Sequence, residues 1–426
     1  MKKTINLKLI LLYIYAFIVI YIPDLSYYIK VNGVVLFIIF TSVFLIKYMG
    51  LKEKDFFKIF SKKPIFIFIC LNIVFALYFA IRTAIAGISL LDFYNLRIFQ
   101  NLIPIFCLVG VCIVYYELDK MKFLKKDKYK FIINVALIQG IIAISMIFIP
   151  AFRNVAYNIF YKQSTDINIY ISASRLYGIC DGNYTYSFQI LHSILALFTF
   201  YFAYFYKEKK YYLYAVIIFL VTVLNGRTGI IIFLIGLVLL LVYIIIKEQK
   251  ILKAVQIVIA TLTLGIIAYM IIIKFLPNTT TLIMHAINDV ISFANENDDT
   301  TEVYALVNGI FLPPGIVNKI FGTGYRVYAK YGYNFGFNQS SDIGFVNDFF
   351  MGGIFYIILV YYSYLQLIFI IRRDKTENDF EKIMAVTVLI SVIISNIKGE
   401  VFRSQMQIAT ILFLLIFMLF KEKKNE

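Results

Sequence analysis

The 426-residue chain contains no tryptophan, only two histidines and four cysteines, and few charged residues, which make up 15% of it. Soluble domains carry about 25% charged residues. Hydrophobic residues make up 61% of the chain, more than a soluble protein of this length could bury in one core. These figures exclude a soluble domain, a disordered chain and a disulfide scaffold. They predict an all-α polytopic integral membrane protein, with residues 1–426 forming a single transmembrane domain.

The scarcity of cysteine and histidine also limits the chemistry that the chain can perform. Cys70, Cys107 and Cys112 lie inside apolar runs, Cys180 lies outside them, and no CxxC spacing occurs. We therefore expect neither a zinc site nor a disulfide framework, no cofactor, and chemistry that needs no metal ion. Because tryptophan is absent, an aromatic belt at the membrane interfaces must be built from the 34 tyrosines.

Apolar runs account for most of the sequence. A membrane span needs about 20 apolar residues, and we expect twelve spans. The first follows Met1-Lys2-Lys3 and has no small-residue cleavage site after it, so we expect a span there and not a cleaved signal. The twelve segments centre on residues 8–23, 31–47, 64–81, 98–116, 131–150, 185–205, 211–224, 229–246, 254–274, 345–370, 383–397 and 406–420.

The lysines and arginines alternate from loop to loop. Alternate loops, together with the two termini, hold 28 of the 41 basic residues. Cytoplasmic loops carry this excess, so we expect both termini to be cytoplasmic. Two long segments then lie outside, at 151–184 and, between spans nine and ten, at 276–344. The apolar spacing from Leu282 to Ile291 in the larger one predicts an amphipathic helix. The net charge of +16 thus reflects topology, and no nucleic acid partner is expected.

The arginines are distributed differently from the lysines. The chain has 32 lysines and 9 arginines, and seven of the arginines fall on or near the predicted outer side: Arg82, Arg97, Arg153, Arg175, Arg227, Arg326 and Arg403. Guanidinium groups bind phosphate and carboxylate through two parallel hydrogen bonds, which lysine cannot do. One hypothesis is an anionic ligand at the outer face. The other is pairing with outer acids such as Asp92, Asp166 and Asp181.

Four short motifs map to this same outer side. The first precedes span six and the second lies between spans seven and eight. The third spans the end of the large outer segment and the start of span ten, where Gly352-Gly353 follows, and the fourth lies between the last two spans. They are Arg175-x-x-Gly178…Gly182-Asn183, Asn225-Gly226-Arg227-x-Gly229, Gly322-x-Gly324-x-Arg326 with Ser341-Asp342-x-Gly344, and Lys398-Gly399-Glu400 with Arg403.

In this order, the motifs resemble those of the O-antigen and capsular polysaccharide polymerases (Wzy-type), within the superfamily that includes the O-antigen ligases. Two departures are visible: Gly182 stands where proline is common, and Gly226 replaces a serine. Ligases usually carry a histidine near the position of Asp342, and this chain has none there.

The resemblance implies a multi-pass protein of the bacterial cytoplasmic (inner) membrane. Such enzymes are membrane glycosyltransferases that join repeat units carried on undecaprenyl pyrophosphate at the outer leaflet, and they work beside a chain-length regulator and a flippase. The leaving pyrophosphate gains negative charge, which fixed arginines would stabilise. The candidates are Arg175, Arg227, Arg326 and Arg403, with Arg227 also counted as catalytic.

A general base would deprotonate the acceptor hydroxyl. Asp342 and Glu400 are our candidates because they belong to the motifs, while Asp348, His192 and His285 are alternatives. The matched glycines and asparagine are expected to shape the site: Gly178, Asn183, Gly229, Gly322, Gly324 and Gly344. For Gly229 we expect the helix backbone to approach a lipid phosphate closely.

Three other classes of protein stay open. A ligase of the same superfamily would transfer the finished glycan to another acceptor. A lipid-linked oligosaccharide flippase or transporter would typically show two related halves, and no such repeat is visible. A membrane acyltransferase would need a catalytic histidine, for which His285 and Asp289 offer an H-x-x-x-D match.

Overall fold

A computed structural model of the chain describes most of the helical core. The described residues are 7–23, 25, 33–85, 87, 98–161, 176–180, 185–275, 309–324, 341, 343–373, 378–397, 399 and 406–419. Within them the fold is all-helical and contains no strand. The predicted amphipathic helix from Leu282 to Ile291 lies outside the described residues.

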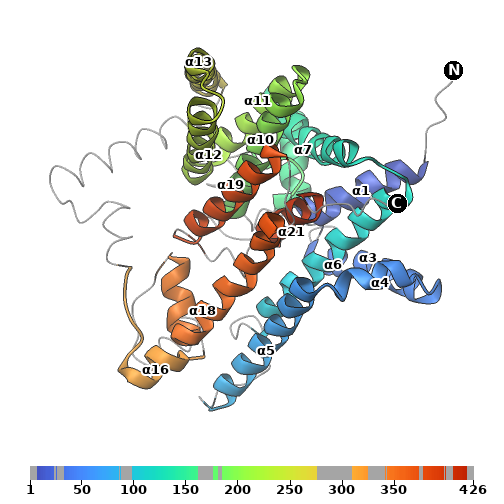
Figure 1. The fold of residues 1–426 in the computed structure, drawn as a ribbon, viewed down its shortest axis with the longest axis vertical. Coiled ribbons are helices and arrows are strands. Elements are labelled where there is room, and N and C mark those ends of the chain that lie inside the picture. Colours follow the sequence, from blue (N-terminus) through green and yellow to red (C-terminus); the bar gives the residue numbers. More distant parts are fainter. Residues whose placement is uncertain are drawn as a thin grey trace.

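Figure 1 shows the described helices in their order along the chain. They are α1 (Leu7–Tyr21), α3 (Gly33–Gly50), α4 (Lys54–Phe60), α5 (Lys63–Ile85), α6 (Ile98–Lys120), α7 (Lys125–Phe148), α8 (Pro150–Ala156), the π-helix η1 (Tyr157–Tyr161), α10 (Thr185–Tyr206), α11 (Lys210–Asn225), α12 (Arg227–Ile246), α13 (Ile251–Phe275), α16 (Gly315–Phe321), α18 (Gly344–Arg373), α19 (Asp379–Ser395) and α21 (Met406–Leu419).

Seven of the described helices are long and apolar enough to cross a membrane: α3, α5, α6, α7, α10, α12 and α18. A helix also lies over each of the other five predicted segments, namely α1, α11, α13, α19 and α21. The short helices α4, α8 and α16 were not expected from the sequence, because helices of 7 residues are too short to show a periodic pattern.

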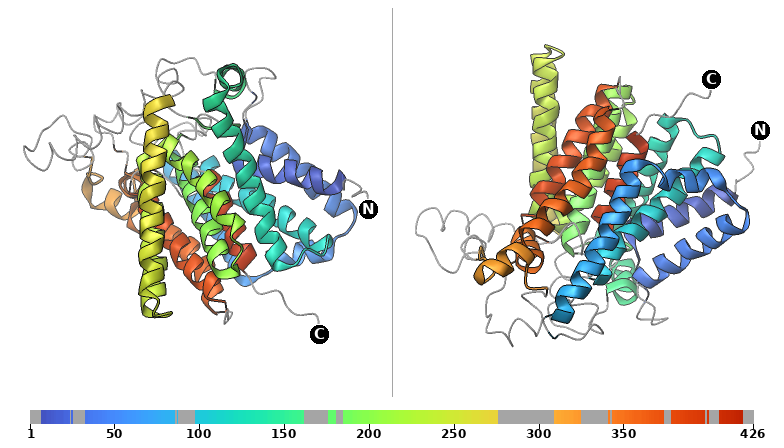
Figure 2. Two further views of the ribbon diagram at one scale, coloured as in Figure 1. Left: turned by 90° about the horizontal axis from the view of Figure 1, so that it is seen from above. Right: turned by 60° about the horizontal axis from the view of Figure 1, so that its bottom comes forward.

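Helix α10 forms the centre of the bundle. In the most apolar 18-residue stretch of α10, 89% of the residues are buried, against 22% in the corresponding stretch of α3. Helices α7, α11, α12, α19 and α21 surround it. By contrast α13 stands at the edge, where it packs against α11 and α12 (Figures 1 and 2).

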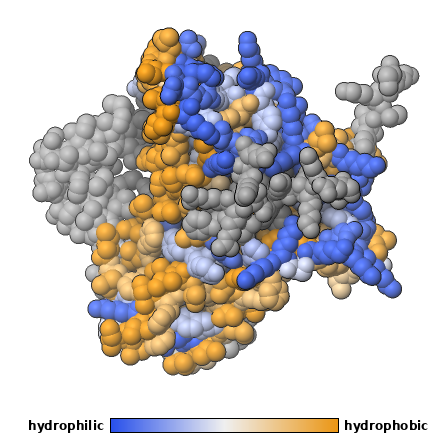
Figure 3. Space-filling view, viewed as in Figure 1, coloured by the Kyte–Doolittle hydropathy of each residue, from blue (hydrophilic) through white to orange (hydrophobic). Residues whose placement is uncertain are grey.

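The outer surface of the bundle is largely apolar. Leu262 of α13 is 63% exposed and Ile81 of α5 is 59% exposed. In Figure 3 the hydrophobic surface covers the lower left of the molecule, over α5, α16 and α18, whereas hydrophilic surface gathers along the upper and right-hand edges. Exposing apolar patches of this extent to water is unfavourable, whereas lipid can cover them. The molecule is therefore suited to a membrane.

Residues 378–381, here called the α19 anchor, tie the start of α19 to three other helices. Asn378 accepts a hydrogen bond from the Phe380 amide at 3.1 Å, which caps the helix, and donates to the Tyr206 hydroxyl of α10 at 3.1 Å. The Phe380 ring is fully buried. It packs against aromatic rings of α7 and α10: Tyr129, Phe198, Phe202, Phe205 and Tyr206.

The two acids of the α19 anchor bind α12 and α7. Asp379 accepts hydrogen bonds from Tyr243 at 2.8 Å and Lys247 at 2.5 Å, at the end of α12. Glu381 accepts one from Tyr129 at 3.1 Å and pairs with Lys125 at 2.5 Å, at the start of α7. The end of α12 thus meets the start of α19, so these two helices run antiparallel.

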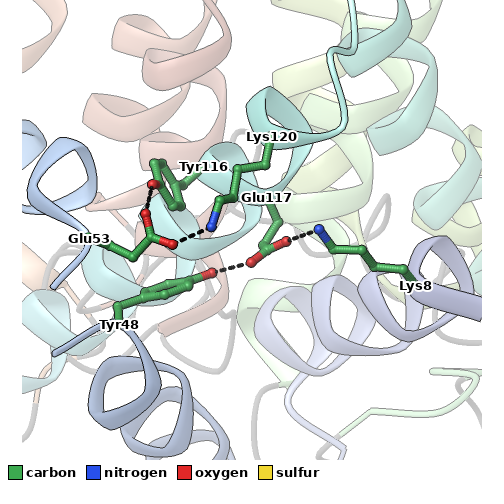
Figure 4. A network of polar contacts seen from close by, with 6 residues as sticks. All are labelled: Lys8, Tyr48, Glu53, Tyr116, Glu117 and Lys120. Carbon is green, nitrogen blue, oxygen red and sulfur yellow. Dashed lines mark hydrogen bonds and ion pairs between the residues drawn. The ribbon is translucent and has the colours of Figure 1, made fainter. Parts of the chain in front are cut away.

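Tyrosine and lysine together satisfy other carboxylates near the helix ends. The Glu53 carboxylate accepts a hydrogen bond from Tyr116 at 2.6 Å and contacts Lys120, and these contacts hold the pKa of Glu53 below its usual range. A second acid beside it, Glu117, also contacts a tyrosine and a lysine. Figure 4 shows the two neighbouring sets of contacts, Glu53 with Tyr116 and Lys120, and Glu117 with Tyr48 and Lys8. Tyrosine hydroxyls thus donate hydrogen bonds to carboxylates here. In a chain without tryptophan, tyrosine is the aromatic residue that can do this.

Helix α18 is not the continuous span that the sequence predicts. It bends at Gly353, whose φ of 71° and ψ of −177° lie outside the helical region. The segment after α16 docks on this bend: the amides of Thr323 and Gly324 donate to the carbonyls of Phe350 and Met351, each at 2.9 Å. The Arg82 guanidinium of α5 also contacts the Gly322 carbonyl.

A Cβ atom has no room at this junction. One added to Gly322, which has a φ of 69°, would lie 2.0 Å from the Met351 carbonyl oxygen. We predict that Gly322→Ala separates the segment from α18 and exposes it to protease, with a lower melting temperature of the purified protein. Gly315→Ala is the matched control. Gly315 has a similar φ of 73°, but a Cβ added there would meet no atom within 4 Å. Gly315→Ala therefore measures only the backbone cost of an alanine at positive φ, about 1 kcal/mol. Equal melting temperatures for the two variants would contradict the steric argument.

Candidate functional site

The structure docks the first outer motif on the second. Leu176, which follows Arg175, has both of its backbone groups held by the side chain of Asn225, the last residue of α11. The Asn225 side-chain oxygen accepts from the Leu176 amide at 3.0 Å, and its nitrogen donates to the Leu176 carbonyl at 2.6 Å. Asn225 is 1% exposed. Because Arg227 begins the next helix, this clamp fixes the neighbours of two candidate arginines to each other.

A second amide side chain holds the other end of this segment. Gln139 of α7 donates to the Tyr177 carbonyl at 2.7 Å and accepts from the Ile179 amide at 3.2 Å. Gly178 lies between these residues, and an added Cβ would come within 2.7 Å of the Gln139 side chain. The matched Gly178 is thus explained by close packing against α7.

Gly229 permits a close approach between helices. An added Cβ would lie 2.5 Å from the Gln189 carbonyl oxygen of α10, and the Ser193 hydroxyl donates to the Gly229 carbonyl at 2.6 Å. The sequence analysis expected Gly229 to admit a lipid phosphate. In the structure α10 occupies this side of the glycine.

The third and fourth motifs also dock on each other. An added Cβ on Gly344, at the start of α18, would lie 2.2 Å from the Gly399 carbonyl oxygen. The Phe345 amide donates to the Asn396 carbonyl at 3.3 Å. Ser341 is fixed by Asn347, whose side chain donates to its carbonyl at 2.7 Å. The neighbours of Asp342 therefore lie beside the residue that precedes Glu400.

The α19 anchor places the two docked pairs at the same end of the bundle. Arg227 begins α12, 16 residues before the anchor contact at Tyr243, and Asn396 lies 17 residues after the contact at Asp379. At 1.5 Å per residue both positions lie about 25 Å from the anchor, in the same direction. The described residues of the two docked pairs thus lie at about the same level of the bundle.

Several predicted site residues lie outside the described residues: Asp342, Glu400, Arg175, Arg326, Arg403, Asn183 and His285. For Arg227 the backbone is described and the side chain is not. Two of the seven outer arginines are described in full. Arg82 contacts the Asn318 side chain at 3.4 Å as well as Gly322. The guanidinium of Arg153 lies 5.2 Å from the Tyr157 ring centre.

The other candidate acid and base are buried. Asp348 is 1% exposed and lies in the first part of α18. His192 is fully buried in α10, with its ring 4.5 Å from that of Phe188 and 5.6 Å from that of Tyr21. In this position it packs as a core side chain, far from the freely accessible location that a surface base would need.

Metal chemistry finds no ready ligands in the described part of the chain. No group of three or more His, Cys, Asp or Glu side chains there could hold a metal ion. The four cysteines form no disulfide bond.

Comparison with known proteins assigns no family. No protein-family model matches the chain, and no curated protein matches its sequence.

The sequence did not reveal the structural roles of the amide residues that hold the motif segments, even though Asn225 belongs to the second motif. Asn225 and Asn396 each stand at the end of an apolar helix and directly before a motif glycine or its segment. An asparagine in that position is a signal, because it can satisfy backbone groups that a helix end leaves free. Gln139 lies inside an apolar helix, where a polar side chain indicates a buried partner.

The clamp at Asn225 can be tested directly. We predict that Asn225→Ala lowers the melting temperature of the purified protein and exposes the 176–180 segment to protease. The change leaves the buried Leu176 amide and carbonyl unsatisfied, at about 1–3 kcal/mol for each. Asn154→Ala, at an exposed position of α8, is the control and should behave as the unmodified protein. An unchanged melting temperature in Asn225→Ala would show that the clamp contributes little.

Proposed function

We propose that the protein is a polysaccharide polymerase, a membrane glycosyltransferase that joins repeat units carried on undecaprenyl pyrophosphate into O-antigen or capsular polysaccharide. The observation that supports this most is that the described parts of the motifs form two docked pairs at about one level of the bundle. Residues far apart in the sequence, such as Leu176 and Asn225 or Gly344 and Asn396, are in direct contact there. A constellation built from distant segments is typical of a site.

The proposed topology has twelve spans, with both termini in the cytoplasm of a bacterium and the 276–344 segment outside. The ion pairs between described residues support this orientation, because their lysines come from the predicted cytoplasmic loops and termini. They include Lys8, Lys120, Lys125 and Lys247. The motif end of the bundle is the opposite one, so the site would face the outer leaflet.

In the proposed reaction, a hydroxyl of the acceptor sugar attacks the anomeric carbon of the donor glycan. The bond from that carbon to the lipid pyrophosphate breaks, and the leaving group takes the bonding electrons. Arg227 and Arg175 would stabilise the charge on the leaving phosphate, with Arg326 and Arg403 beside them. The start of α12 adds the positive end of its helix dipole. Asp342 or Glu400 would accept the proton of the attacking hydroxyl.

An O-antigen ligase is the second candidate, since it would use the same lipid pyrophosphate chemistry. A transporter is less well supported, because nothing in its task calls for arginines collected at one face. Deletion of the gene, followed by gel analysis of surface polysaccharide, separates these functions. A polymerase deletion leaves single repeat units on the surface. A ligase deletion removes attached glycan and leaves lipid-linked polymer, whereas a flippase deletion leaves repeat units unexported.

The orientation predicts which added cysteines a membrane-impermeant thiol reagent can label in intact cells. In a background without the four native cysteines, Asn297→Cys should be labelled and Lys54→Cys should not. Lysis should make Lys54→Cys reactive, which controls for its accessibility. The opposite pattern in intact cells would invert the topology and move the motifs to the cytoplasm.

Arg227 provides the central mutational test. Arg227→Lys keeps the charge but loses the two parallel hydrogen bonds to phosphate. We predict that both Arg227→Lys and Arg227→Ala lower the polymerisation rate by about 10²–10³, the usual cost of one transition-state contact, at normal protein level. The rate is measured as extension of lipid-linked repeat units in vitro. Arg373→Ala, on the predicted cytoplasmic side, should retain activity. Wild-type rates in Arg227→Ala would remove the phosphate-binding role.

The base is tested by neutral variants of the same shape. Asp342→Asn or Glu400→Gln should abolish polymerisation at normal expression, because a carboxamide cannot accept the acceptor's proton. His285→Ala should retain it, and EDTA should have no effect on the wild-type reaction. Activity in both carboxamide variants together with a dead His285→Ala would assign the base to the histidine. Inhibition by EDTA would contradict the metal-independent mechanism.

A further inference from the structure

A pocket of about 360 Å³ lies at the opposite end of the bundle from the motifs, between α1, the turn after α6 and the first part of α7. Its polar lining comes from Tyr13, Lys122, Asp127, Lys130 and Asn134. Aromatic side chains make up much of the rest, with the Tyr13 and Phe131 rings 4.3 Å apart. None of these residues belongs to the proposed polymerase site.

The pocket carries ammonium groups that nearby carboxylates do not fully neutralise. Lys122 is exposed and makes no ion pair within the described part of the chain. Lys130 pairs with Glu208 at 3.2 Å, but Lys126 already pairs with the same Glu208 oxygen at 2.8 Å. Lys130 can therefore turn to a second anion at little cost. A phosphate placed between Lys122 and Lys130 would meet two ammonium groups.

Two neutral polar side chains, Tyr13 and Asn134, also line the pocket. The Asn134 side chain donates to the Tyr13 hydroxyl oxygen at 3.2 Å, which leaves the Tyr13 hydroxyl hydrogen available for another acceptor. Asn134 lies nine residues after the start of α7, or about 14 Å along the helix. The pocket thus extends from the water-exposed turn to the depth at which the headgroup and ester groups of a lipid lie.

Asp127 gives the same pocket one anionic group. It would repel a headgroup that is purely anionic and attract one that carries an amine beside its phosphate. We propose that the pocket binds an aminophospholipid of the leaflet on the lysine-rich side, with its phosphate between Lys122 and Lys130 and its amine beside Asp127. Interhelical basic pockets at this depth suit lipid headgroups. The proposal is independent of the polymerase function.

The test is a binding titration of the purified full-length protein in detergent with short-chain phosphatidylethanolamine, read by the shift in melting temperature. Lys122→Gln should weaken binding by about tenfold, since one charge-assisted hydrogen bond is lost. Lys52→Gln is the matched control. Lys52 is also exposed, follows a helix end, and has a similar positive φ, 51° against 58° for Lys122. It should bind as the unmodified protein does.

Two further arms identify the headgroup. Asp127→Asn should lose the preference for phosphatidylethanolamine over short-chain phosphatidylglycerol that the unmodified protein shows. Inorganic phosphate should produce no comparable shift. The proposal is overturned if Lys122→Gln and Lys130→Gln both bind phosphatidylethanolamine at wild-type affinity, if phosphatidylglycerol binds the unmodified protein more tightly, or if inorganic phosphate alone saturates the pocket. Melting temperatures without lipid establish that each variant is folded.

Discussion

The start of α19 sets the register of the bundle. The α19 anchor combines a helix cap, a buried aromatic ring and two carboxylates, which together contact α7, α10 and α12. Since helices are stiff over this length, fixing one end fixes the height of the other. The anchor holds α12 and α19 antiparallel, so the start of α12, next to Asn225, lies at about the level of Asn396, just beyond the end of α19.

The outer motifs consist of two kinds of residue with different tasks. The glycines and asparagines that the structure describes are used in packing and backbone hydrogen bonds, as at Gly344, Gly178 and Asn225. The arginines and acids stand close to them in the chain, either before them, as Arg175 and Asp342 do, or after them, as Arg227 and Glu400 do. This arrangement separates the framework of the site from its chemical groups. A precise backbone holds positions from which long charged side chains can reach a ligand.

The sequence predicted the helices well because hydropathy is a summed property of some 20 residues and tolerates local detail. A helix lies over every predicted span, and seven meet the full length and composition expected of one. The bend at Gly353 was missed because it depends on a partner, the segment ending at Gly324, that is distant in sequence. The roles of Asn225 and Gln139 were missed for the same reason. Which acid is the base stays a prediction, because neither periodicity nor composition distinguishes Asp342 from Glu400.

The peripheral position of α13 has a mechanical consequence. This helix leads into the large segment that follows residue 275 and packs mainly against α11 and α12 among the described helices. The same segment rejoins the bundle at Gly322–Gly324, where backbone hydrogen bonds to α18 hold it. The segment therefore has one compliant attachment and one stiff one. A displacement of the chain beyond residue 275 would therefore act first on α13, which has few packing partners among the described helices, and only afterwards on the hydrogen-bonded junction with α18.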